Sequence, residues 1–193
     1  MGEYDVGKRM AKSAEAMDRY GKERADEVLR AADMIVRAYR KGGKVLLFGN
    51  GGSAAEAQHM AAELVNRMLM DREPLPAVSL TTDTSNLTSI ANDFGYDVVF
   101  EKQVKALGRD GDVAIGFSTS GTSKNVNLAL SAARESGMTT IGFAGAEGTE
   151  IGGLCDLCLW VDADSTPVIQ EVHLALVHII CEVVEIELFG GGG

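Results

Sequence analysis

The stretch VLLFGNGGS at residues 45–53 decides the fold. Its four leading apolar residues, followed at once by a glycine-rich segment, are typical of a buried strand that ends in a turn. Ser53 is a residue type that commonly begins a helix, so we expect a helix to follow this turn. A strand, a glycine turn and a helix in this order form the first unit of a parallel sheet.

The same alternation continues along the chain. Short apolar runs bounded by turn residues predict four further strands, over residues 76–80, 112–117, 139–144 and 157–161. Segments with helical periodicity lie between them, over residues 85–91, 98–107 and 125–136. Strands separated by helices form right-handed crossover units, so the sequence predicts an α/β fold with a mainly parallel sheet covered on both faces.

Helices are predicted at both ends. Apolar residues at three- and four-residue steps between Ala25 and Tyr39 indicate an amphipathic helix, and a shorter helix around residues 10–17 precedes it. The last helix, over residues 167–188, carries two apolar seams, so we expect it to pack against its own domain and against another subunit. The narrow polar stripe that remains holds Glu171, His178, Glu182 and Glu185.

Length and composition fit one domain, because the chain has 193 residues and 46% of them are hydrophobic. We predict a single domain over residues 1–193, with N-terminal helices (1–40), a parallel-sheet core (41–165), a C-terminal helix (166–189) and a flexible tail (190–193). No segment resembles a signal peptide or an uninterrupted membrane span, so we expect a cytoplasmic protein without a membrane partner.

The net charge of −10 argues against nucleic acid as a partner, because proteins that bind the phosphate backbone present concentrated Lys and Arg. It is compatible with one small anionic ligand, since backbone N–H groups and hydroxyls can hold a phosphate without net positive charge.

The cysteine pattern has two interpretations. Cys155 and Cys158 form a C-x-x-C motif, which can indicate redox or zinc chemistry. A second Cys/His pair at zinc-finger spacing is missing, and residues 157–160 are typical of a buried strand. We interpret the pair as structural.

Two loops have the chemistry of a phosphate site. Residues 49–53 follow the first strand, and their glycines allow close approach of a ligand to the backbone at a helix N-terminus. Residues 118–123 follow a later strand and carry five hydroxyls within six positions. Each loop alone would also fit a polar turn with a helix cap. Because both follow strands of one parallel sheet, we favour a phosphate ligand.

A few ionisable side chains are placed for proton transfer. His59 and Glu63 are four residues apart on the helix that follows the first loop, so they share a face. On the last helix His178 lies on the polar stripe, whereas His173 is expected to be peripheral. An imidazole and a carboxylate can isomerise a sugar through an enediol if burial shifts their pKa values toward neutrality. With Gln170 they could instead bind a divalent metal, although Gln170 and His178 are about 12 Å apart along the helix.

Several ordered motifs resemble the sugar-isomerase (SIS) domain family, and within it the phosphoheptose isomerases. The similar segments cover almost the whole chain and are residues 49–53, the helix with His59 and Glu63, and residues 92–95, 118–121 and 169–173. The resemblance implies a flavodoxin-like three-layer α/β/α sandwich and a homotetramer with active sites between subunits. It also implies conversion of sedoheptulose 7-phosphate to D-glycero-D-manno-heptose 7-phosphate, a precursor of the heptose in lipopolysaccharide.

The resemblance also implies roles for individual residues. Glu63 would be the general base and His178 the general acid. One zinc ion per subunit would be bound by His59, Glu63, Gln170 and His178. The substrate would be bound by Asn50, Gly51, Gly52, Ser53, Glu63, Asn92, Asp93, Ser118, Thr119, Ser120, Ser123 and Gln170.

The chain departs from the family pattern near the sugar site. Val168 stands where many relatives have Arg, Pro167 replaces a small or acidic residue, and residues 54–55 are two alanines. Reaction class is therefore predicted more firmly than substrate identity.

Two other functions compete with an isomerase. A related tetrameric adaptor binds the bacterial replication-initiator protein without catalysis, but by resemblance it lacks a histidine matching His178. The third possible function is that of a regulatory module that binds a sugar phosphate. Such modules normally accompany a second domain, for which this chain has no room.

Overall fold

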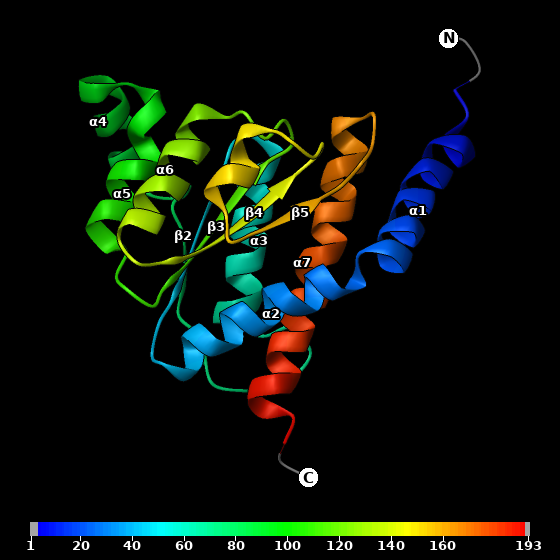
Figure 1. Ribbon diagram of the computed structural model, residues 1–193, viewed down its shortest axis with the longest axis horizontal. Helices are drawn as coiled ribbons and strands as arrows, with labels where there is room; N and C mark the ends of the chain where they lie inside the picture. Colours follow the sequence, from blue (N-terminus) through cyan, green and yellow to red (C-terminus); the bar gives the residue numbers. More distant parts are fainter. Residues whose placement is uncertain (1–3, 192–193) are drawn as a thin grey trace.

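The structure is a computed structural model that describes residues 4–191 and contains one parallel sheet with helices on both faces (Figure 1). The strands are β1 (Val45–Gly49), β2 (Ala77–Ser79), β3 (Val113–Ser118), β4 (Thr139–Ala144) and β5 (Leu157–Trp160). The α-helices are α1 (Val6–Glu23), α2 (Ala25–Arg40), α3 (Gly52–Val65), α4 (Thr84–Phe94), α5 (Val99–Leu107), α6 (Lys124–Glu135) and α7 (Thr166–Phe189). Two 3-10 turns, η1 (Tyr96–Val98) and η2 (Glu150–Leu154), complete the described chain.

The strand order is β2-β1-β3-β4-β5, and every neighbouring pair is parallel. This is the order of a flavodoxin-like doubly wound sheet, so the predicted fold class is confirmed. The chain leaves β1 toward β2 on one side and returns to β3 on the other. The direction of winding therefore reverses between β1 and β3, and in open parallel sheets this is where ligands bind.

Alternate side chains of the central strands enter two separate cores. Leu47, Ile115 and Phe143 face α1, α2, α3 and α7, whereas Leu46 and Phe48 face α5 and α6. In Figure 1 the sheet accordingly lies between the group α4, α5 and α6 and the group α2, α3 and α7. Because both faces are covered, the strands read as continuous apolar runs rather than alternating ones.

Element boundaries agree with the sequence within a few residues, with two differences. The first helix was expected to be shorter than the second, but α1 has 18 residues and α2 has 16. It extends from Val6 because Asp5 caps it, accepting a hydrogen bond from the Lys8 N–H at 2.9 Å. In the predicted tail, residues 190–191 form a turn, and residues 192–193 lie outside the described part of the chain.

The C-x-x-C sulfurs lie together against the backbone of β4. A side chain at Gly142 would meet the Sγ atoms of Cys155 and Cys158 at 2.8 and 3.0 Å, so glycine provides the space for both. The hydrogen bond with Cys155 and burial raise the pKa of the Cys158 thiol, which disfavours the reactive thiolate. These contacts support the structural interpretation of the pair.

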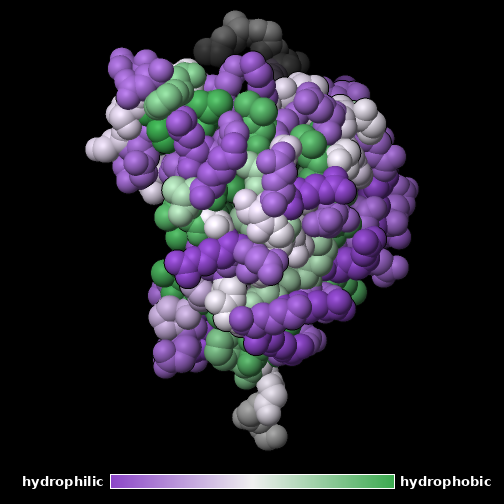
Figure 2. Space-filling view, turned by 60° about the vertical axis from the view of Figure 1, so that its left-hand side comes forward, coloured by the Kyte–Doolittle hydropathy of each residue, from purple (hydrophilic) through white to green (hydrophobic). Residues whose placement is uncertain are grey.

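The surface over α4 and α5 is mainly hydrophilic, as Figure 2 shows for the side of the molecule on which these helices lie. None of the helices within residues 4–191 combines the length and apolar character that crossing a bilayer requires.

Candidate active site

Both loops expected to bind phosphate lie where the winding of the sheet reverses. β1 pairs with β3 from Val45 opposite Val113 to Gly49 opposite Phe117, so the two loops leave adjacent strands at the same edge. The first enters α3 on one face of the sheet and the second enters α6 on the other. The structure therefore brings together two polar loops that are about 70 residues apart in the sequence.

A reciprocal pair of amides joins these loops. Asn50 Nδ2 donates to Asn125 Oδ1, and Asn125 Nδ2 donates to Asn50 Oδ1, each at 2.9 Å. Asn125 is buried in the first turn of α6 and also accepts from the Val126 N–H at 3.0 Å. The sequence analysis missed Asn125, because an Asn in a first helical turn normally indicates a local cap.

The second loop is closed by its own hydroxyls. Ser118 Oγ donates to Ser123 Oγ at 2.8 Å, and the Thr122 N–H donates to Ser120 Oγ at 3.2 Å. Gly121 has a φ of +67°, a backbone conformation that residues other than glycine rarely adopt. Its N–H donates to the Ser118 carbonyl. The hydroxyls are thus gathered around one turn beside the start of α6.

Three predicted proton-transfer side chains meet between α3 and α7. The Nε2 atoms of His59 and His178 are 2.8 Å apart, and His59 Nε2 is 3.3 Å from Glu63 Oε1. One ligand atom from each residue lies within 4.8 Å of the others, so the group could hold a metal ion. All three side chains are half-buried, which limits but does not prevent access by water. His178 comes from the same chain as His59 and Glu63.

Gln170 lines the same cavity as His59 and contacts the first loop. The cavity has a volume of about 330 Å³ and is lined by Gly52, Ala55, Glu56, His59, Pro167, Gln170, Glu171 and Leu174. A Cβ atom at position 52 would lie 2.4 Å from Gln170 Nε2, so the Gln170 amide can occupy this place only when residue 52 is glycine. This packing explains the glycine directly before Ser53, whose own side chain is buried, whereas Gly51 has a φ of +57° that favours glycine.

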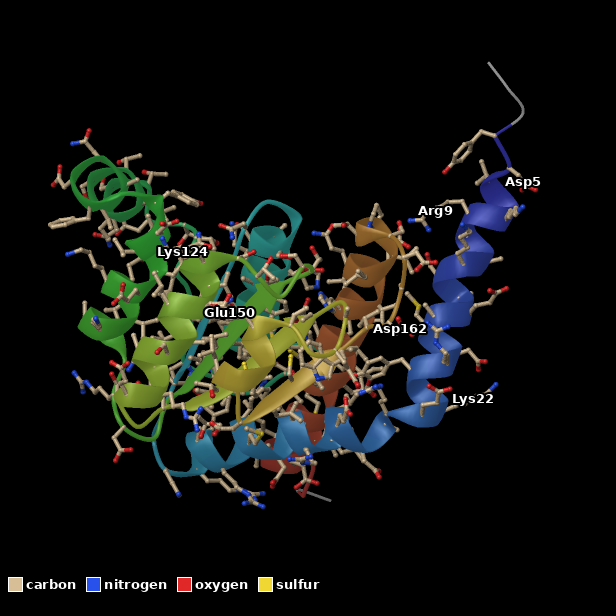
Figure 3. The ribbon with its side chains drawn as sticks, turned by 45° about the horizontal axis from the view of Figure 1, so that its top comes forward. Asp5, Arg9, Lys22, Lys124, Glu150 and Asp162 are labelled. Carbon is tan, nitrogen blue, oxygen red and sulfur yellow. The ribbon has the colours of Figure 1, made fainter. Side chains whose placement is uncertain are left out.

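Helix α1 closes one side of this region. Arg9 Nη2 donates to Glu171 Oε1 at 2.8 Å, and the Ser13 hydroxyl also bonds to Glu171. These hydrogen bonds lower the pKa of the Glu171 carboxyl, Ser13 having the larger effect. Figure 3 shows Arg9 on the side of α1 that faces α7. The sequence analysis gave α1 no part in the site.

The departures from the family pattern have different places in the structure. Pro167 lines the cavity, so this change alters its wall directly. Val168 is 4% exposed and packs into the core from the buried face of α7. Of the two alanines at 54–55, Ala55 lines the cavity.

Two residues predicted to bind the substrate lie away from this cavity. Asn92 and Asp93 are exposed on α4, where Asn92 Nδ2 donates to Asp93 Oδ1 at 2.8 Å. Within residues 4–191 neither lines the cavity between α3 and α7.

The expectation that His173 is peripheral is wrong. Its side chain is fully buried, because this face of α7 packs on the sheet against Phe143.

Comparison with known proteins shows the family of the chain. The family model for the SIS domain matches residues 10–145. The phosphoheptose isomerase of Nitratidesulfovibrio vulgaris is 50% identical over 176 residues, which cover 91% of this chain and 85% of that protein. The chain belongs to the phosphoheptose isomerase family.

Solved structures agree with this family assignment. The phosphoheptose isomerase of Neisseria gonorrhoeae has a TM-score of 0.88 and 44% identity, covering 93% of this chain and 96% of that one. That of Francisella tularensis has a TM-score of 0.89 and 34% identity, covering 93% and 95%. The resemblance to the family and the three-layer fold are thereby confirmed.

Proposed function

We propose that this protein converts sedoheptulose 7-phosphate to D-glycero-D-manno-heptose 7-phosphate, as an aldose–ketose isomerase that supplies heptose for lipopolysaccharide or related glycoconjugates. The observation that carries the proposal is the meeting of His59, Glu63 and His178 between α3 and α7, where α3 begins in the glycine-rich loop of residues 49–53. The hydroxyl-rich loop of residues 118–123 follows the adjacent strand. Membership of the phosphoheptose isomerase family supports the substrate. Such a charged sugar phosphate does not cross membranes, so we place the activity in the cytoplasm.

The substrate phosphate is bound by the hydroxyls of the two loops. They belong to Ser53 in the first turn of α3 and to Ser118, Thr119, Ser120 and Ser123 between the end of β3 and the start of α6. Helix N-termini and hydroxyls together bind a dianion without nearby lysine or arginine. Asn50, Gly51, Gly52 and Gln170 then face the sugar, and Asn92 and Asp93 approach it only if α4 or another subunit contributes to the site.

Glu63 and His178 move the protons. Isomerisation removes a proton from the carbon beside the carbonyl and returns one to the neighbouring carbon through an enediol. Glu63 takes the carbon-bound proton as general base and returns it to the neighbouring carbon. His178 transfers a proton to and from the sugar oxygen, as general acid. His59 lies 2.8 Å from His178 and 3.3 Å from Glu63, so it orients both groups.

The same side chains fit a zinc ion. Two imidazole nitrogens and one carboxylate are a donor set of catalytic zinc sites, which keep one position for water or substrate. We propose that His59, Glu63 and His178 hold one zinc per subunit, with Gln170 completing the set from the same cavity. A bound zinc would polarise the carbonyl and stabilise negative charge on the sugar oxygens.

An apolar cavity supports assembly into a homotetramer. It has a volume of about 210 Å³ between α1, α2 and α7, and its lining includes Met17, Leu29, Leu176 and Ile179. Leu29 and Ile179 are 52% and 46% exposed. Apolar side chains that are open along one seam of α7 fit a second copy of this chain, as its two-sided pattern predicts.

Turnover of sedoheptulose 7-phosphate by the purified protein tests the proposal. NMR would identify the aldoheptose product, and the Glu63→Gln variant is the control for contaminating activity. Product from the wild type but not from the variant supports the isomerase. If neither forms product, the replication-initiator adaptor is favoured, and a pull-down of that initiator is the next experiment. The adaptor gains no support from the relatives, which are named as isomerases.

A further inference from the structure

A buried carboxylate and a buried imidazole face each other behind the site. Glu56 lies on α3 one turn before His59, and His173 lies on α7 one turn after Gln170. Glu56 is 6% exposed and His173 is fully buried. The distance from Glu56 Oε1 to His173 Nδ1 is 3.9 Å. No step of the proposed isomerisation uses either group.

The tautomer of His173 follows from its surroundings. Its Nε2 lies 3.3 Å from the carbonyl oxygen of Ala144. A carbonyl only accepts, so Nε2 carries a hydrogen. The ring is held edge-on against Phe143, with centroids 5.4 Å apart and planes at 84°. In a neutral imidazole Nδ1 would then carry a lone pair directed at the carboxylate.

Two acceptors facing each other in a buried place are unfavourable. Among residues 4–191, neither Glu56 oxygen nor His173 Nδ1 has a hydrogen-bond partner. The basic groups near the cavity are engaged elsewhere, Arg9 with Glu171 and His59 with Glu63 and His178. A buried charge without a partner is strongly disfavoured. One proton between Glu56 and His173 removes both problems.

We propose that Glu56 and His173 share one proton and that this bond fixes α3 against α7, which makes both side chains positioning residues. A movement of about 1 Å brings Oε1 and Nδ1 to hydrogen-bond distance. The bond lies one turn from His59 on one helix and one turn from Gln170 on the other, so it sets the width of the cavity. The positioning role rests on the isomerase function proposed above, whereas the shared proton does not.

Nitrogen NMR of the histidine-labelled wild type tests the shared proton without any turnover. The chain has three histidines, so the His173 signals can be assigned with one variant at each other position. A slowly exchanging proton between Nδ1 and the carboxyl is expected, one that is lost in Glu56→Leu whether it resides mainly on nitrogen or on oxygen. A lone pair on Nδ1 with no such exchange-protected proton would overturn the proposal, since the pair would then be bridged by water or ligand.

Variants of Glu56 test the positioning role. Glu56→Gln retains a donor toward Nδ1, so its kcat should stay close to that of the wild type. Glu56→Leu leaves Nδ1 without a partner, and kcat should fall about 10- to 100-fold with a smaller change in KM. Equal kcat values for Glu56→Leu and the wild type would overturn the role, as would equal losses in both variants.

A matched control separates positioning from loss of stability. Gln103 is buried on α5 in the other core and donates to the carbonyls of Leu80 and Val99. Gln103→Leu should lower the midpoint of thermal unfolding and leave kcat unchanged. If it lowers kcat as much as Glu56→Leu does, the effect at Glu56 is one of general stability and the positioning role fails.

Discussion

The Nε2 atoms of His59 and His178 lie 2.8 Å apart, although 119 positions separate the residues in the sequence. At this distance one nitrogen donates and the other accepts, so Nε2 carries a hydrogen in one ring and a lone pair in the other. The contact joins α3 and α7 directly at the proposed catalytic group.

Removal of bound metal should abolish turnover. Chelation is expected to stop product formation, and added zinc to restore it, because two imidazoles and Glu63 form the proposed zinc site. Elemental analysis should give about one zinc per chain in the wild type and much less in His59→Asn. Full turnover after complete chelation would exclude the metal from the mechanism and keep the acid–base pair.

Replacement of either proposed proton-transfer group should lower kcat with little effect on assembly. Glu63→Gln and His178→Asn are each expected to lose about 10²- to 10⁴-fold in kcat, which is the usual contribution of a general acid or base. Glu182→Gln, one turn after His178 on α7, is the control and should retain activity. Size-exclusion chromatography with light scattering should show one assembly for all four proteins. A smaller assembly in Glu63→Gln or His178→Asn would assign that residue a structural role.

The fold could be predicted from the sequence because the signals that define its strands and helices are local. Each strand is an apolar run closed by glycine or a polar turn, and the first strand and its glycine loop alone indicate a parallel sheet. The contact of His59 with Glu63 was also predictable, because four residues on one helix place two side chains on one face.

The remaining features depend on tertiary packing. The depth of His173 follows from which face of α7 lies on the sheet, and both faces of this helix are apolar. The amide pair of Asn50 and Asn125 needs the register of β1 against β3. The contact of Arg9 with Glu171 needs the path of α1 across α7. No periodicity within one segment contains this information.

Addition of a methyl group at Gly52 should impair substrate binding more than folding. The new Cβ of Gly52→Ala would lie 2.4 Å from Gln170 Nε2, which is the end of a flexible side chain and can move away. Stability should therefore change little, whereas KM should rise several-fold as Gln170 leaves the cavity. Gly7→Ala on α1 is the control, because its Cβ would make only an ordinary contact at 3.4 Å. An unchanged KM in Gly52→Ala would remove Gln170 from the binding residues.

A charge in the apolar cavity between α1, α2 and α7 should break the assembly. Ile179→Asp places a carboxylate among Met17, Leu29 and Leu176, where a second copy would have to bury it. Sedimentation at several concentrations should show dissociation into smaller species. Leu107→Asp is the matched control, because Leu107 is 42% exposed at the end of α5 on the other side of the sheet. Identical sedimentation of Ile179→Asp and the wild type would place the interface elsewhere.

Glu185 should be the most stabilising charge of α7. It is 1% exposed, accepts from the backbone N–H groups of residues 68–70 at 2.6–2.9 Å, and is paired with Arg72 at 3.0 Å. Loss of one partner of a buried pair lowers the free energy of unfolding by about 3–5 kcal/mol. Chemical denaturation should give this loss for Glu185→Gln. Glu187→Gln should lose at most about 1 kcal/mol, because its pair with Arg40 is exposed.

The pH dependence of this difference identifies its source. Burial raises the pKa of the Glu185 carboxyl, but the backbone N–H donors and Arg72 outweigh burial and hold it below its ordinary value of 4.5. A carboxyl with a depressed pKa in the folded protein stabilises fully above the pKa of the unfolded chain. That stabilisation is lost as the pH falls through the folded value. The difference in unfolding free energy between the wild type and Glu185→Gln should therefore be constant near pH 7 and shrink below about pH 4.5. A difference that persists unchanged into acid would mean that shape, rather than charge, makes Glu185 stabilising.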